Sequence, residues 1–135
     1  MGMALSPLRD RRILVVEDEA LVGMSLQDAL NTVGALVIGP VATVEKAIET
    51  IASKPGLDAA IVDVNLGGAM AYPVADALIA SNVPFVFTSG YEDGVFHARY
   101  PEIRNCHKPY AFETIAEALS AAMAHKKSGC DLLSR

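Results

Sequence analysis

Two kinds of hydrophobic pattern alternate along the chain. Short runs rich in β-branched residues occupy residues 12–16, 35–39, 59–64 and 84–89, and a weaker run occupies residues 103–107. These runs lack the strict polar alternation of a strand with one solvated face. We therefore expect five strands that are covered on both faces.

Longer stretches between the runs carry apolar residues at helical spacing and predict four helices. The stripes are Val22, Leu26, Leu30 and Val33; Val44, Ala47, Ile48 and Ile51; Val74, Ala77, Leu78 and Ser81; and Phe112, Ile115, Leu119 and Met123. Met24 and Met123 fall on helical faces where we expect them to be in the core. A fifth helix belongs between residues 92 and 101, but Gly94 and Pro101 predict a short or irregular segment there.

Alternating strands and helices predict an α/β fold, with a parallel sheet between two layers of helices. The length of 135 residues suits one domain. We expect an N-terminal extension over residues 1–10, a folded domain over residues 11–125 and a flexible tail over residues 126–135. Ligands of such sheets bind beyond the carboxyl ends of the strands.

Polar side chains collect at these predicted strand ends. In chain order they are Glu17 and Asp18, Asp63 with Asn65, Thr88 and Ser89, and Lys108. Adjacent carboxylates resist desolvation, and Mg²⁺, which prefers oxygen ligands, would offset their repulsion. One carboxylate can then attack phosphorus, while an ammonium and a hydroxyl stabilise the charge of the transition state. Together the strand ends indicate phosphoryl transfer.

Each part of this set also has a simpler interpretation. Glu17, Asp18 and Glu19 could merely favour the start of a helix through its dipole. The stretch from Asp63 to Gly68 could be a plain turn, and Lys108 alone could be a surface lysine. The combination, in order at successive strand ends, is more specific than any part.

Composition excludes several classes of function. Hydrophobic residues make up 52%, charged residues 20%, and the net charge is -5. This balance is typical of a globular protein and offers no basic surface for nucleic acid. No apolar run is long enough to span a bilayer, so we expect no membrane association. Cys106 and Cys130 lack motif spacing, and we interpret them as free thiols in a reducing cytoplasm.

The segments ILVVEDE, AAIVDVNLGG, PFVFTSGY and HKPYAFETIAEAL resemble the receiver domain of bacterial response regulators. The resemblance covers roughly residues 11–123. It implies a three-layer, flavodoxin-like fold, in which a five-stranded parallel sheet of order 2-1-3-4-5 is packed with five helices. It also implies Mg²⁺ as cofactor and a histidine kinase as phosphoryl donor.

The family's site residues carry over by position. Asp63 resembles the phosphoacceptor aspartate. Asp18 resembles a direct Mg²⁺ ligand, and Glu17 resembles a ligand that acts through water. Asn65 resembles the residue whose backbone carbonyl binds the metal.

The switch residues carry over in the same way. Ser89, rather than Thr88, resembles the switch hydroxyl that bonds the phosphoryl group. Lys108 resembles the invariant lysine, whose bond to Pro109 is cis in the family.

One position departs from the family pattern. Receiver domains usually carry Tyr or Phe three residues before the lysine, and here that residue is Asn105. The segment FTSGY instead resembles the motif of the FAT GUY group of single-domain response regulators, which typically lack this aromatic. Tyr91 could then take part in switching, or could be a partly exposed loop residue.

The favoured interpretation is a stand-alone receiver that turns over no separate substrate and is therefore not an enzyme. It would act as an adaptor for a downstream protein or phosphotransferase, or as a phosphate sink. The main alternative is a pseudo-receiver that binds partners without phosphorylation. Two other classes fit less well. A small Mg²⁺-dependent phosphatase would need a second acid where Asn65 stands. In a flavodoxin-like FMN binder, the acids after the first strand would repel the phosphate of FMN.

Overall fold

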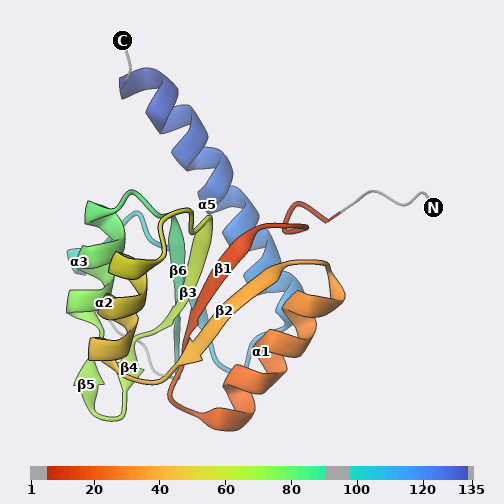
Figure 1. The fold of residues 1–135 in the computed structure, drawn as a ribbon, viewed down its shortest axis with the longest axis vertical. Coiled ribbons are helices and arrows are strands. Elements are labelled where there is room, and N and C mark those ends of the chain that lie inside the picture. Colours follow the sequence, from red (N-terminus) through yellow and green to blue (C-terminus); the bar gives the residue numbers. More distant parts are fainter. Residues whose placement is uncertain (1–5, 91–97, 134–135) are drawn as a thin grey trace.

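The structure is a computed structural model that describes residues 6–90 and 98–133, with side chains up to His125 in the last helix. Five parallel strands form one sheet in the spatial order β2-β1-β3-β6-β7 (Figure 1). In chain numbering this is the predicted order 2-1-3-4-5. The strands are β1 Arg12–Val16, β2 Leu36–Val41, β3 Ala59–Asp63, β6 Phe85–Ser89 and β7 Asn105–His107.

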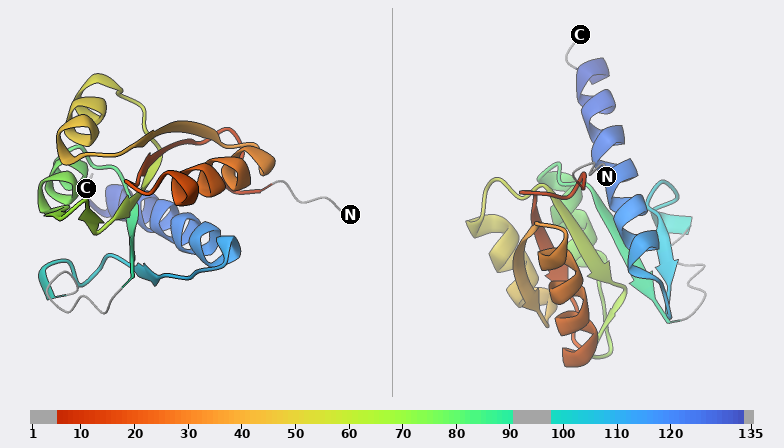
Figure 2. Two further views of the ribbon diagram at one scale, coloured as in Figure 1. Left: turned by 90° about the horizontal axis from the view of Figure 1, so that it is seen from below. Right: turned by 90° about the vertical axis from the view of Figure 1, so that its right-hand side faces the viewer.

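Helices cover both faces of the sheet, which confirms the predicted three layers. Figure 2 shows α1 and α5 on one face and α2 and α3 on the other. These helices are α1 Ala20–Thr32, α2 Val44–Ser53, α3 Tyr72–Ala80 and α5 Phe112–Leu133. Successive strand residues point to opposite faces, so Ile13 and Val15 pack in one apolar cluster while Leu14 and Val16 pack in the other.

The helical stripes mostly mark the core. Leu26, Leu30, Ile115 and Leu119 are buried in the cluster beneath α1 and α5. The prediction for Met24 is wrong, because its residue is 55% exposed. Positions two residues apart in the sequence are separated by about 200° around a helix. Met24 and the buried Leu26 therefore lie on nearly opposite sides of α1.

Two features predicted from the sequence involve residues outside the described ranges. Residues 91–97, with Tyr91 and most of the expected irregular helix, are outside the described residues, whereas Ala98 and Arg99 are helical. Helix α5 continues to Leu133, so the backbone of residues 126–133 is helical. Figure 1 shows that the last turns of α5 project past the amino edge of the sheet.

A small hairpin follows β3, where the sequence suggested at most a turn. Strands β4 (Asn65–Leu66) and β5 (Ala69–Met70) pair antiparallel around Gly67 and Gly68. Both glycines have positive φ, at 63° and 95°, as the central residues of a type I′ turn must. The hairpin therefore fixes the backbone directly after Asp63.

The edge strand β2 is interrupted by a bulge at Gly39 and Pro40. Gly39 has a φ of 99°, and a Cβ built there would lie 2.8 Å from the Val15 carbonyl oxygen and 2.9 Å from the Val41 nitrogen. Backbone atoms on both sides leave no room for a side chain. The register shift between β1 and β2 falls at this point, between Leu14 and Val16.

We expect Gly39→Ala to destabilise the fold far more than Gly56→Ala. Gly56 has a similar φ of 96° but meets only Arg12 Nη1, at 3.7 Å, so its substitution carries backbone strain alone, roughly 1–2 kcal/mol. Gly39→Ala adds the clash and should cost at least about 3 kcal/mol. Urea unfolding of both variants measures the difference, and equal losses would show that the bulge yields to a side chain.

Candidate functional site

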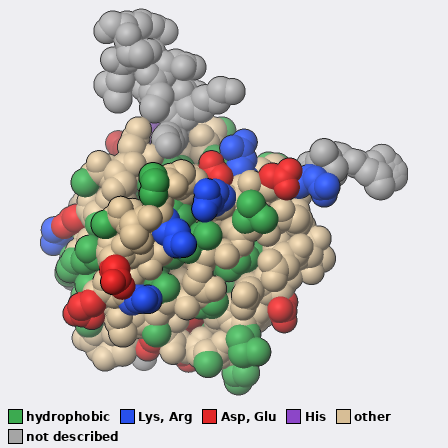
Figure 3. Space-filling view, viewed as in Figure 1, with side chains coloured by type: hydrophobic (Ala, Val, Ile, Leu, Met, Phe, Trp, Pro, Cys, Tyr) green, Lys and Arg blue, Asp and Glu red, His purple; other side chains and the backbone are tan. Residues whose placement is uncertain are grey.

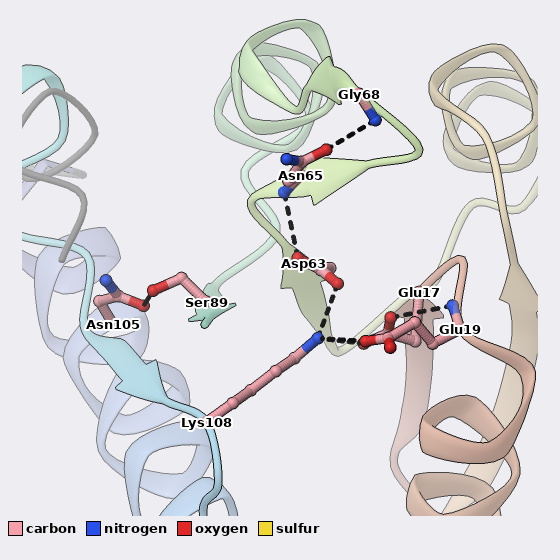
Figure 4. A network of polar contacts seen from close by, with 8 residues as sticks. All are labelled: Glu17, Glu19, Asp63, Asn65, Gly68, Ser89, Asn105 and Lys108. Carbon is pink, nitrogen blue, oxygen red and sulfur yellow. Dashed lines mark hydrogen bonds and ion pairs between the residues drawn. The ribbon is translucent and has the colours of Figure 1, made fainter. Parts of the chain in front are cut away.

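The carboxyl ends of β1, β3, β6 and β7 meet at one edge of the sheet and line an open cleft of about 730 Å³. The polar side chains around it are those of Asp18, Glu19, Asp63, Asn65, Ser89 and Lys108. Figure 4 shows the polar contacts of Glu19, Asp63, Asn65, Ser89 and Lys108 with one another and with Glu17, Gly68 and Asn105. The structure thus brings together all the described residues that the sequence placed at the strand ends, except Thr88.

Lys108 is the centre of this network. Its Nζ lies 2.9 Å from Asp63 Oδ2, 3.1 Å from Glu19 Oε1 and 3.3 Å from Glu17 Oε1. Burial alone would lower the pKa of Lys108, but its hydrogen bonds to Asp63 and Glu19 and the nearby charges outweigh burial and raise it. The side chain therefore stays an ammonium. The Lys108–Pro109 peptide bond is cis, as the resemblance implies.

Glu17 is a buried carboxylate, with 3% of the residue exposed. Its Oε2 accepts a hydrogen bond from the Glu19 backbone N–H at 3.1 Å. Its Oε1 faces the Lys108 ammonium but accepts no well-directed hydrogen bond from any described residue. Burial, followed by the neighbouring Asp63 carboxylate, raises the pKa of Glu17 to about 7.

The acids at this edge are arranged so that they could hold a metal ion. One carboxylate oxygen from each of Glu17, Asp18 and Asp63 lies within 4.8 Å of the others. All three donors are oxygens, as Mg²⁺ and Ca²⁺ prefer. The buried Glu17 Oε1, which accepts no hydrogen bond from the described residues, also suits a cation. The residues present therefore fit the implied cofactor.

Asp63 is held from two sides at the end of β3. Its Oδ1 accepts a hydrogen bond from the Asn65 backbone N–H at 3.0 Å, and its Oδ2 accepts one from Lys108. The Asn65 side chain in turn accepts a 2.7 Å hydrogen bond from the Gly68 N–H, within the hairpin. The backbone that follows Asp63 thus orients its carboxylate, which lines the open cleft.

Ser89 and Thr88 end the neighbouring strand β6 and behave differently. Ser89 lines the cleft, and its hydroxyl donates a 3.2 Å hydrogen bond to Asn105 Oδ1 on β7. The Thr88 hydroxyl is buried and makes no hydrogen bond within the described part of the chain. Because adjacent strand residues face opposite sides of the sheet, only one of the two can serve the cleft. Of the two, Ser89 lines the cleft.

Sequence reasoning assigned no role to two residues that belong to this neighbourhood. Glu19 pairs with Lys108, and its place in the acidic run was a signal, although not of that contact. The Tyr110 hydroxyl is buried and makes no hydrogen bond to the described residues. Burial, and then the charge of Glu17, raises the pKa of Tyr110 to about 12. No sequence signal pointed to Tyr110.

Solved structures of response regulators are similar to this chain. A receiver protein from Sinorhizobium medicae WSM419 is 25% identical with a TM-score of 0.78, over 88% of this chain and 98% of that one. SdrG from Sphingomonas melonis Fr1 is 41% identical with a TM-score of 0.73, over 84% and 96%. The fold, the site and this degree of identity together show that the chain belongs to the receiver domains of response regulators.

Two further matches extend this comparison. The BeF3-activated conformation of SdrG from Pseudomonas melonis Fr1 is 38% identical with a TM-score of 0.70, over 90% of this chain and 99% of that one. The phyllosphere-induced regulator PhyR of Methylorubrum extorquens is 28% identical over 94% of this chain. The chain spans about half, 49%, of the length of that curated relative. The sequence matches no family model.

No helix among the described residues is both long and apolar enough to cross a lipid bilayer. The same part of the chain contains a buried free cysteine, Cys106, in β7.

We expect the contribution of Glu17 to the stability of the metal-free protein to fall as the pH rises from about 4.5 to about 7, because the pKa of Glu17 rises from 4.5 to about 7 on folding. Glu17→Gln removes this loss and should be more stable than the wild type at pH 8 by about 1–3 kcal/mol. At pH 4 the two proteins should differ little.

Urea unfolding in a chelating buffer at both pH values tests this, with Glu113→Gln on the exposed first turn of α5 as control. A Glu17→Gln variant that is less stable at pH 8 would mean that the ion pair with Lys108 outweighs burial.

Proposed function

We propose that this chain is a phospho-signalling receiver in which Asp63 accepts a phosphoryl group from the phosphohistidine of a histidine kinase. The observation that carries the proposal is the position of Asp63, buried at the cleft in contact with the Lys108 ammonium and within 4.8 Å of carboxylate oxygens of Glu17 and Asp18. The BeF3-activated conformation of SdrG, a 38% identical relative, supports it, because beryllofluoride mimics a phosphoryl group.

In the proposed transfer, an Asp63 oxygen attacks phosphorus as the phosphorus–nitrogen bond to the imidazole breaks. The electron pair of that bond leaves with the imidazole, and an aspartyl phosphate remains. Lys108 then neutralises phosphoryl oxygens, and the Ser89 hydroxyl donates a hydrogen bond to one of them. Hydrolysis of the acyl phosphate resets the protein, so no separate substrate is turned over.

The implied cofactor would be held by the side chains of Glu17, Asp18 and Asp63 together with the Asn65 backbone carbonyl. When bound, Mg²⁺ offsets the repulsion between the carboxylates and the incoming phosphoryl oxygens. The Asn65 N–H would orient Asp63 through its own hydrogen bond of 3.0 Å.

We also propose that the chain acts through protein contacts in the manner of the FAT GUY group of receivers. Asn105, in place of the usual aromatic, supports that assignment. The phosphorylated face would bind a downstream protein or a phosphotransferase, and a short-lived phosphoryl group would instead favour a sink that drains the kinase. The lifetime of the aspartyl phosphate separates these two roles.

An apolar patch beside the cleft suits the docking of the phosphodonor. Leu21 and Met24, on α1, are 81% and 55% exposed. Figure 3 shows hydrophobic side chains protruding at the bottom of the view, over the start of α1. Leu21 is two residues from Glu19, which contacts Lys108. A helix of the phosphodonor that covers Leu21 would therefore lie against the site.

We expect the wild type to gain one phosphoryl group from acetyl phosphate only when Mg²⁺ is present, because Asp63 is the nucleophile and its carboxylate neighbours repel the donor without a cation. Asp63→Asn should gain none, and Asp28→Asn, an exposed control on α1, should behave as the wild type. Intact mass spectrometry, followed over time, measures both the gain and its decay. A wild type that forms no adduct with any donor would support the pseudo-receiver instead.

We expect Leu21→Asp to slow transfer from a phosphorylated histidine kinase by about tenfold or more, because a charge replaces an apolar docking contact. Its labelling by acetyl phosphate should be unchanged. Ile79→Asp is the matched control, since Ile79 is 53% exposed on α3. Equal rates for the two variants with the kinase would place the docking surface elsewhere.

A further inference from the structure

The Ser89 hydroxyl is already committed to a partner before any phosphoryl group arrives. It donates to Asn105 Oδ1 at 3.2 Å, and a hydroxyl has one proton to donate. Figure 4 shows the hydroxyl pointing toward Asn105 and away from Asp63. To donate to a phosphoryl group on Asp63, the Ser89 hydroxyl must therefore give up its hydrogen bond to Asn105.

Strand pairing fixes the backbone around this contact, so the contact can change through side-chain rotation alone. The Lys108 N–H donates to the Ser89 carbonyl at 2.7 Å, and the Phe87 N–H donates to the Arg104 carbonyl at 2.9 Å. These bonds fix the backbones of β6 and β7 on either side of the pair. Rotation of the Ser89 side chain can exchange its acceptor without a change in the strand register.

Burial gives the exchange a free-energy cost. Ser89 is 2% exposed, and Asn105 is half-buried. When the hydroxyl leaves, the Asn105 carbonyl loses a hydrogen bond that water replaces only in part. Asn105 therefore stabilises the unphosphorylated state relative to the phosphorylated one.

We propose that Asn105 is a positioning residue that holds the Ser89 hydroxyl in the resting state, so that phosphorylation switches the protein by moving one hydrogen bond from Asn105 to the phosphoryl group. This inference rests on the proposed function and assigns a role to the residue that replaces the usual aromatic. The signal starts as a polar exchange between β6 and β7, without the inward swing of a ring. The Asn105 side-chain amide, released from Ser89, is then the part of β7 that differs between the two states.

A double-mutant cycle with Mg²⁺ and beryllofluoride tests the proposal. We expect Asn105→Ala to bind beryllofluoride about two- to tenfold more tightly than the wild type, because the competing acceptor is gone. Asn105→Leu keeps a branched side chain of similar shape on β7 and should tighten binding in the same way. In a Ser89→Ala background, the substitution of Asn105 should have no effect. Asn31→Ala, on the exposed side of α1, is the control.

Amide chemical shifts of Lys108 during the titration report binding, and thermal unfolding shows that each variant is folded. Unchanged or weaker binding by both Asn105 variants would overturn the proposal, as would a tightening that persists in Ser89→Ala. These outcomes leave the proposed function standing, because the wild type still binds beryllofluoride. A wild type that does not bind it at all would overturn the proposed function and this switch with it.

Discussion

The Lys108 ammonium lies within 3.3 Å of three carboxylates, those of Asp63, Glu19 and Glu17. One positive charge cannot balance them all, and the consequences spread through the site. The buried Glu17 holds its proton more tightly than a free glutamate does, and Asp63 is drawn toward the lysine. The carboxylates leave room for a second cation. The arrangement is therefore both strained and receptive, which suits a site that must accept a charged group.

The parallel sheet explains why the sequence predicted so much of this site. Strands that are buried on both faces give continuous apolar runs, and each run ends at the edge of the sheet. Glu17, Asp63, Ser89 and Lys108 each stand at or next to such an end, and parallel pairing brings the ends to one edge. Convergence thus follows from topology alone, without knowledge of any side-chain contact.

What the sequence could not predict depends on side-chain direction. The contact of Glu19 with Lys108 depends on how the start of α1 faces the cleft, and the burial of the Tyr110 hydroxyl depends on tertiary packing. Met24 was likewise misplaced, because it lies outside the Leu26 and Leu30 stripe that meets the sheet, and an apolar side chain is not buried by its hydrophobicity alone. The hydrogen bond between Ser89 and Asn105 belongs to the same class, since it joins residues on separate strands.

Both edges of the sheet are poor templates for another strand. At one edge, β2 is broken by the bulge at Gly39, and Pro40 has no N–H to offer a neighbour. At the other edge, β7 is only three residues long. Short and interrupted edges discourage strand addition between molecules. Two features that lie outside the site therefore protect the protein against polymerisation through its sheet edges.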